Sequence, residues 1–256
     1  MKKSLILFLA LFFLIPSFAL SNIFTFKVGL FIPRAQSDLW IEEFKNMSFS
    51  KTNFTTTNFN FAYEYFLTRE VSVVLGVDSY SQNKAGTYVD YVGIQFDEGD
   101  FAFPTDYEEF FPTFPAQHSF NVSITPIQLS LKLTPMGRKG KFIPFVGGGV
   151  GLYLWNVRLN GALVDFDNVW VYEPDDIDIF PITTVDAWER NRISFGYHAF
   201  GGVMVPFTKR MTFEVEFKYT VAKGNFRTDP DQIAFVGFEA FDLSGYQISL
   251  GLNYWF

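Results

Sequence analysis

Hydrophobic and polar residues alternate with a period of two along eight segments of this chain. The clearest is residues 211–221, in which six apolar residues alternate with Thr, Glu, Glu, Lys and Thr. Successive side chains of a β-strand point to opposite faces of a sheet, so this spacing predicts strands with one apolar and one polar face. The predicted strands cover residues 23–32, 58–65, 71–78, 119–134, 142–157, 193–205, 211–221 and 245–256.

The links between the predicted strands alternate in length. Short turns at residues 66–70, 135–141 and 206–210 alternate with long, largely acidic links. Membrane barrels of the up-and-down type have short periplasmic turns and longer external loops. The pattern therefore predicts an all-β fold, an eight-stranded antiparallel up-and-down transmembrane β-barrel with long external loops and short periplasmic turns. The nearest soluble alternative, a lipocalin-like barrel, would bury the aromatic face and expose the charged one.

One predicted strand changes its apolar parity at a proline. In residues 119–134 the apolar positions Phe120, Val122 and Ile124 are even, whereas Ile127 and the following leucines are odd. Proline inside a sheet is confined to edges and bulges. The sequence therefore predicts a β-bulge at Pro126.

The N-terminus has the organisation of a secretory signal peptide. Lys2 and Lys3 precede an apolar run at residues 5–15, and small residues follow up to position 21. The run is shorter than the roughly 20 residues that a membrane-spanning helix needs. We expect residues 1–21 to be a cleaved signal peptide and residues 22–256 to form the barrel domain.

Composition narrows the class of protein further. The formal net charge is −7, which disfavours nucleic acid as a partner, and the absence of cysteine excludes a disulfide framework. Aromatic residues make up 20% of the chain, with 34 phenylalanines. Since no helix-length apolar segment follows the N-terminus, we expect strands to be the membrane element.

Three stretches carry a resemblance to known outer-membrane proteins. The last strand ends on Phe256 with Tyr254 two residues before it, which resembles the C-terminal signal of bacterial outer-membrane β-barrels. The stretches Ile-Thr-Pro-Ile-Gln-Leu-Ser-Leu-Lys-Leu-Thr-Pro (124–135) and Pro-Phe-Val-Gly-Gly-Gly-Val-Gly (144–151), with that strand, resemble small barrels related to the OmpA transmembrane domain and OmpW.

The resemblance implies a location and partners. The location is the outer membrane of a Gram-negative-type bacterium, reached by export through the signal peptide. The partners are outer-membrane lipid and lipopolysaccharide, and the barrel-assembly machinery during insertion; the barrel itself is expected to be monomeric.

Polar residues on the inward face form the first candidate site. The interior of an eight-stranded barrel has room only for side chains, so we expect the charged ones to pair and to close the lumen. The predicted network comprises Lys27, Glu64, Asp78, Lys132, His198, Glu214, Glu216 and Lys218. An ion or proton path through the same residues is the alternative.

The long links form the second candidate site. They are rich in carboxylates and aromatic residues, and carboxylates concentrated in loops suit Ca²⁺ or Mg²⁺. The candidate metal ligands are Glu173, Asp175, Asp176 and Asp178, although their spacing lacks the pattern of an EF-hand. Apart from such an ion, we expect no cofactor.

The expected function is a structural or surface-interaction role through the external loops, without enzymatic activity. A narrow channel for small hydrophobic or ionic solutes is the alternative that the OmpW resemblance implies. A barrel enzyme that modifies lipid is a more distant alternative, based on His118 and Ser119. Adjacent strand residues point to opposite faces, so His118 is not expected to activate Ser119.

Overall fold

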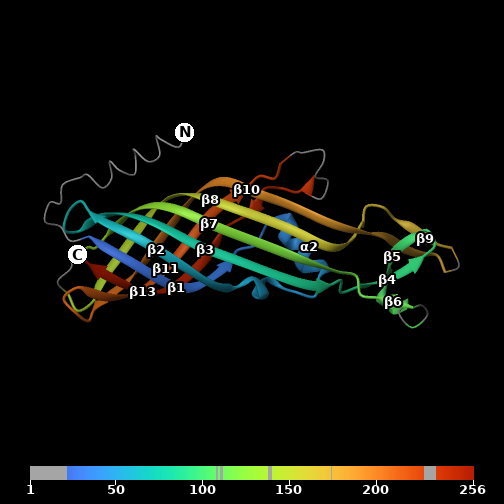
Figure 1. Cartoon of the computed structure of the whole chain (residues 1–256), viewed down its shortest axis with the longest axis horizontal. Helices are drawn as coiled ribbons and strands as arrows, with labels where there is room; N and C mark the ends of the chain where they lie inside the picture. The colour runs from blue at the N-terminus through green and yellow to red at the C-terminus, as the bar shows by residue number, and fades with distance from the viewer. Residues whose placement is uncertain (1–21, 108, 110–111, 138–139, 174, 228–234) are drawn as a thin grey trace.

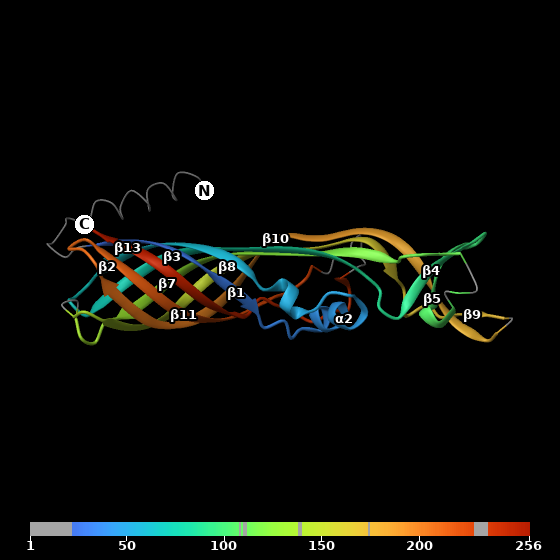
Figure 2. The ribbon, with the colours of Figure 1, turned by 90° about the horizontal axis from the view of Figure 1, so that it is seen from below.

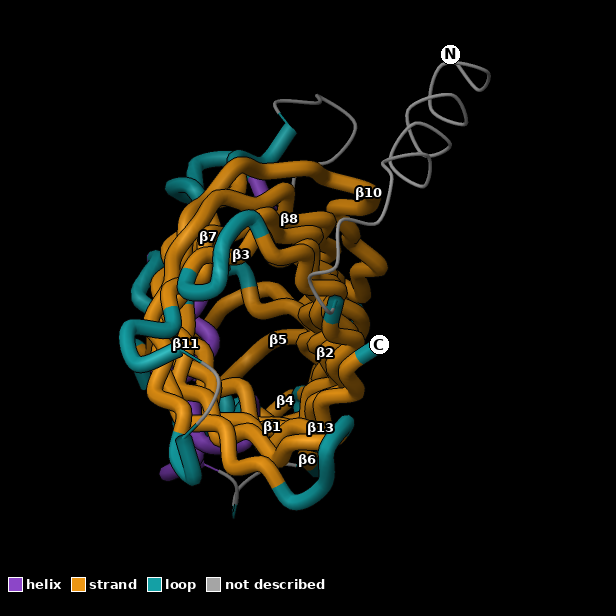
Figure 3. The backbone as a smooth tube through the Cα atoms, turned by 90° about the vertical axis from the view of Figure 1, so that its left-hand side faces the viewer, coloured by secondary structure: helices purple, strands orange, loops and turns teal. Residues whose placement is uncertain are grey.

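The chain folds into one closed antiparallel barrel of eight strands, seen in a computed structural model. The structure describes residues 22–107, 109, 112–137, 140–173, 175–227 and 235–256, so the predicted signal peptide lies outside the described residues. Figure 3 looks along the barrel and shows the strands forming a ring. The barrel strands are β1 (Ile23–Pro33), β2 (Thr56–Phe66), β3 (Val71–Thr87), β7 (Gln117–Leu133), β8 (Ile143–Val164), β10 (Ile177–Pro206), β11 (Met211–Gly224) and β13 (Gly245–Trp255).

The last strand closes the barrel against the first. β13 pairs with β1 from Ile23↔Trp255 to Pro33↔Gly245, and β13 also pairs with β11 on its other side. The backbone amide of Asn22 donates to the carbonyl of Phe256, which extends this pairing beyond the strands. Closure leaves no free edge in the barrel, and the predicted eight-stranded fold is confirmed.

The two ends of the barrel differ, as the lengths of the links predicted. Tight turns join the strands at the end that carries the C-terminus, which we call the turn end, and long connections lie at the opposite loop end (Figure 1). The long connections contain α2 (Asp38–Asn46), η1 (Lys51–Phe54), β4 (Tyr91–Phe96), β5 (Gly99–Pro104), η2 (Thr105–Tyr107), β6 (Thr113–Phe114), β9 (Trp170–Tyr172) and β12 (Phe241–Asp242). In the described residues, no helix combines the length and apolarity needed to cross a membrane.

The outer surface of the turn-end half is apolar around the barrel. On β13 the outward Ile248, Leu250 and Leu252 alternate with buried Gln247 and Ser249. Leu250 is 66% exposed, and a soluble sheet would not leave such a face in water. Lipid is the medium that satisfies this belt, because barrels in membranes carry apolar residues outside and polar residues inside.

Strand β7 reverses its polarity without a bulge, so the prediction of a bulge at Pro126 was wrong. Its register with β8 is unbroken from His118↔Gly161 to Leu133↔Val146, and even-numbered residues face inward throughout. What changes is the medium outside. Beyond the belt, water replaces lipid, so the apolar residues move to the inner face and the polar ones to the outer face.

The irregularity lies in β10 instead. Its pairing with β8 shifts between Glu189 and Arg192, and Asn191 adopts a positive φ of 54°. Asparagine tolerates this left-handed conformation better than most residues. The extra residue changes which parity of β10 faces inward above the belt.

Candidate functional site

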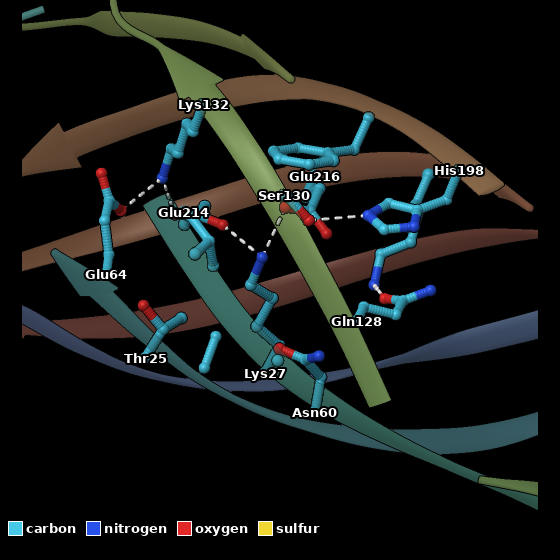
Figure 4. Close-up of a pocket in the computed structure, with 15 residues that line it drawn as sticks. Thr25, Lys27, Asn60, Glu64, Gln128, Ser130, Lys132, His198, Glu214 and Glu216 are labelled. Carbon is cyan, nitrogen blue, oxygen red and sulfur yellow. Dashed lines mark hydrogen bonds and ion pairs between the residues drawn. The ribbon is translucent and has the colours of Figure 1, made fainter. Parts of the chain in front are cut away.

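The lumen inside the belt holds the eight predicted polar residues, each 7% exposed or less. Lys27 Nζ lies 2.7 Å from Oε1 of Glu214 and also forms an ion pair with Glu216. Lys132 Nζ lies 3.0 Å from Glu64 and 3.4 Å from Glu214 (Figure 4). Glu214 thus joins two lysines from opposite sides of the barrel into one network.

A second ion pair lies deeper toward the loop end. Lys218 Nζ donates to Asp78 Oδ2 at 2.9 Å and to the side-chain carbonyl of Gln128 at 3.0 Å. Asp78 also accepts from the amides of Asn60 at 2.7 Å and Gln247 at 3.3 Å. The buried charge of Asp78 is therefore satisfied by donors from three other strands, β2, β11 and β13.

His198 is part of this polar interior without pairing with a carboxylate. Its Nε2 forms a 2.7 Å hydrogen bond with Oγ of Ser130, and its ring stacks on Phe200 with centroids 6.0 Å apart. No acid is within ion-pair distance of it among the residues that the structure describes. The geometry is that of a hydrogen-bonded core histidine.

The alternation of β11 explains how these charges meet. Glu214, Glu216 and Lys218 occupy every second position, so all three point into the lumen. Lys27 on β1 and Lys132 on β7 reach these residues from the two sides of β11, two and three strands away around the barrel. Burial of charge is tolerated here because each ion has a partner of opposite sign.

The space left between these side chains is small. A cavity of about 30 Å³ lies among the Lys27, Glu216 and His198 side chains, and a second of about 10 Å³ lies beside Asp78 and Tyr153. Each has room for one or two water molecules at most. Below them, Ile143, Phe145 and Met204 form a buried apolar cluster, and Lys132 lies 4.1 Å above the Phe145 ring.

An aromatic plug, which the sequence did not predict, fills the lumen above the belt. Trp40 on α2 packs against Phe54, Phe120 and Phe241 with ring centroids 5.0 to 5.2 Å apart. Its indole Nε1 donates to the carbonyl of Asp242 at 3.0 Å. The helix thus lies inside the mouth of the barrel, and its large side chains exclude solvent from the upper lumen.

A buried polar contact ties α2 to the wall. Nε2 of His118 on β7 lies 2.8 Å from Oε2 of Glu43 on α2, and the His118 ring packs edge-on against Tyr88. Leu39 and Glu43 are both buried and lie one helical turn apart on the same face of α2. This spacing is the feature of the sequence from which an inward helix face could have been predicted. Ser119, next to His118, points outward and donates to the carbonyl of Asn160, so the two side chains lie on opposite faces.

Beyond the barrel mouth, part of the long connections forms a separate projection, which we call the arm. The arm consists of β4, β5, β6, β9 and the adjoining part of β10, paired in one sheet. Figures 1 and 2 show it extending away from the barrel at the loop end. It has its own buried core of Ile94, Phe101, Phe103, Ile177 and Ile179, so it is an ordered element rather than a loose loop.

The arm carries acids and no bases. Residues 88–117 and 165–181 contain no Lys, Arg or His. Their acids are Asp90, Asp97, Glu98, Asp100, Asp106, Glu108, Glu109, Asp165, Asp167, Glu173, Asp175, Asp176 and Asp178. Next to them Val169, Trp170 and Val171 expose about half of their surface.

The predicted metal ligands lie in this arm, three on the turn between β9 and β10 and Asp178 at the start of β10. Glu173, Asp175, Asp176 and Asp178 are all exposed to solvent. In the described part of the chain, no group of three or more Asp, Glu or His side chains is arranged to hold a metal ion. Binding of Ca²⁺ or Mg²⁺ at these residues therefore stays a prediction.

These features define the class of protein: the fold is that of the small eight-stranded β-barrels of the outer membrane. No known protein-family model and no curated protein matches the chain. Among solved structures, Neisserial surface protein A is similar over 92% of this chain and 97% of its own, with 12% identity and a TM-score of 0.48. Ail, the attachment invasion locus protein of Yersinia pestis, is similar over 93% of this chain and 100% of its own, with 9% identity and a TM-score of 0.43. The N-terminal β-barrel domain of Pseudomonas aeruginosa OprF is similar over 92% of this chain and 97% of its own, with 10% identity and a TM-score of 0.37.

Proposed function

We propose that this chain is an outer-membrane barrel with a closed lumen, and that it acts at the cell surface by binding a cationic polypeptide through its arm. The observation that carries the proposal is the arm itself, a folded sheet that has many carboxylates and no base. The opposite charge of a lysine- or arginine-rich segment complements this surface. Exposed aromatic side chains such as Trp170 can add cation–π contacts to the same ligand.

The rigidity of the arm supports a binding role. The barrel strands β3, β7, β8 and β10 continue past the belt toward it, and β10 also pairs directly with β5 and β9 in the arm. A preordered surface loses less conformational entropy on binding than a loose loop does. The carboxylates of the arm are therefore presented at a fixed position well away from the membrane.

The packing of the lumen argues against a transport function. The channel alternative requires a continuous path, but the two cavities described between the ion pairs are small, and apolar clusters lie toward both ends. Recording in planar bilayers tests this part of the proposal. We expect no stable conductance steps, and nanosiemens steps from the wild-type protein would refute the closed lumen.

A charge-neutralised arm tests the binding role. We expect the fourfold variant D97N/E98Q/D175N/D178N to bind a labelled oligolysine peptide about tenfold more weakly than the wild-type protein in nanodiscs, since exposed pairs contribute up to ~1 kcal/mol each. The matched control D97E/E98D/D175E/D178E keeps every charge and should bind as the wild type does. Equal binding by the neutralised and charge-conserving variants at physiological salt would contradict the proposal.

A further inference from the structure

Strand β10 runs from the barrel into the arm, and its pairing on one edge is interrupted between them (Figure 1). On that edge β11 pairs with β10 from Pro206 to Gly196, and β5 pairs with it again at Phe180 and Pro181. β8 pairs with the opposite edge from Met204 to Ile182. Along residues 182–188, no strand in the described part of the chain pairs with β10 on the edge away from β8. We call this stretch the open edge.

The hydrogen bonds between β8 and β10 show which backbone groups point toward the open edge. The amide of Asp165 donates to the carbonyl of Pro181 at 2.9 Å, and the same register continues into Ile182↔Val164. Hydrogen-bonded pairs alternate along an antiparallel ladder, so the odd-numbered residues of β10 bond to β8 here and the even-numbered ones point away from it. The even-numbered residues are Ile182, Thr184, Asp186 and Trp188. Phe180 has the same parity, which places β5 on this edge as well.

The open edge is long enough to hold a strand. It begins beside β5 and ends near Arg190, whose carbonyl accepts a hydrogen bond of 3.1 Å from the Arg227 side chain. Seven residues of strand span about 23 Å. Thr183, Thr184 and Asp186 are exposed, and residues 182–188 include neither Lys nor Pro, the residues that often protect an edge from further pairing.

The charges around the open edge indicate what could pair with it. At its upper end lies the arm, whose acids have no bases among them. Along the edge itself the side chain of Asp186 is paired with Arg158 at 2.7 Å, and Thr183, Thr184 and Val185 are uncharged. A complementary segment is therefore basic where it reaches the arm and uncharged where it lies beside β10.

We propose that the open edge binds an extended segment of the cationic polypeptide as an additional strand, which fills the interruption between β5 and β11. This inference rests on the proposed function and adds the mode of binding. The bases of the ligand lie against the arm, and its main chain exchanges hydrogen bonds with the N–H and C=O groups of Thr184 and Asp186. In strand addition the main-chain bonds supply affinity and the side chains supply specificity.

A second copy of this chain is a poorer occupant of the open edge. Pairing two copies through this edge would bring two acidic arms toward each other, and like charges repel. A basic ligand gains from the same field. The charge of the arm therefore favours a partner of different composition.

Paired N-methylated peptides test the mode of binding. The probe is a labelled peptide of about ten residues, the length of a long strand, with three lysines followed by alternating Thr and Val. Two derivatives carry N-methyl groups on alternate amides of the Thr/Val part, one on the odd positions and one on the even positions, so they have equal charge. We expect one derivative to bind the wild-type protein in nanodiscs about tenfold more weakly than the parent peptide and the other to bind as the parent does, because only alternate amides face β10.

A variant of β10 tests the same contact from the side of the protein. Thr184→Pro removes an N–H group from the open edge and leaves the hydrogen bonds to β8 in place, so we expect it to bind the parent peptide about fivefold more weakly. The matched control Thr184→Ala keeps the N–H group and should bind as the wild type does. Heat-dependent migration in gels verifies that each variant is folded.

The outcomes separate this inference from the proposed function. Equal binding of the two methylated derivatives overturns strand addition, and if the charge-neutralised arm still loses affinity for the parent peptide, the proposed function stands. Loss of neither kind overturns both. Self-association of the wild-type protein that Thr184→Pro abolishes would assign the open edge to a second copy and also overturn the inference. A difference between the derivatives together with weaker binding by Thr184→Pro supports it.

Discussion

Removal of the Lys218 side chain tests how the charged lumen is stabilised. In the wild-type protein Asp78 is 5% exposed and forms an ion pair with Lys218 at 2.9 Å. Lys218→Ala removes this partner and leaves the carboxylate buried. Breaking a buried pair by removing one partner costs about 3–5 kcal/mol. We expect the lower end, about 3 kcal/mol, because the amides of Asn60 and Gln247 still donate to Asp78.

The same substitution should not open a pore. Lys218 borders the larger cavity and its partner Asp78 borders the smaller one, so its loss can join the two. The joined space still ends at the aromatic plug on one side and at Phe145 and Met204 on the other. Planar-bilayer recordings of Lys218→Ala should therefore match those of the wild-type protein.

A double variant supplies the control. Lys218→Met with Asp78→Asn removes both charges and keeps similar volumes, so we expect it to recover most of the lost stability, as replacement of whole buried pairs often does. Urea unfolding in lipid vesicles, followed by tryptophan fluorescence, measures all variants. The reasoning fails if Lys218→Ala is within about 0.5 kcal/mol of the wild type, the usual range of surface substitutions, or if it conducts.

Three further predictions concern the mouth and the closing strand. His118→Ala should leave the buried Glu43 carboxylate without its 2.8 Å partner and destabilise α2 by about 2 kcal/mol; unchanged hydrogen exchange of the α2 amides would contradict this. Burial of the phenol, with a smaller contribution from Glu43, raises the pKa of Tyr88 to about 12. Because the folded pKa lies above the unfolded value of about 10, stability present below pH 10 should fall as the pH rises toward 12, and Tyr88→Phe should abolish this part of the alkaline loss. Deletion of Phe256, whose amide donates to the Asn22 carbonyl, should slow insertion into vesicles more than it changes the folded barrel, and wild-type insertion kinetics would argue against a role in assembly.

The strands could be predicted because a period of two is a local property. In β11 and β13 every second residue is apolar over the full membrane crossing, so the start of each strand was predicted closely. The upper parts of β3 and β10 were missed. Residues 81–87 of β3 are polar or small on both faces, and such a segment carries no amphipathic signal although it pairs with β7 up to Thr87↔Gln117.

The candidate site was predictable in its members but not in its contacts. Parity alone placed Lys27 and Glu216 on inward faces, but these partners are 189 residues apart and meet only because the barrel closes. The plug was missed because α2 has nine residues, too few for a helical period to stand out, and its Trp40 packs on rings from three other segments. Such contacts depend on register and closure, which no local pattern contains.

The reversal of polarity along the strands also explains how the arm is held in place. Within the belt the barrel is apolar outside and charged inside, so its stability there depends on lipid. Above Pro126 the same strands enclose an ordinary apolar core, including Phe120, Trp155 and Trp40, and face water on the outside. The upper half is therefore stabilised as a soluble β-protein would be, by burial of aromatic surface rather than by the membrane. β8 and β10 are continuous strands that pass from the lipid-facing belt into the core above it, and β10 also pairs directly with the arm. The belt therefore sets the orientation of the arm, and the core above the belt makes the arm rigid.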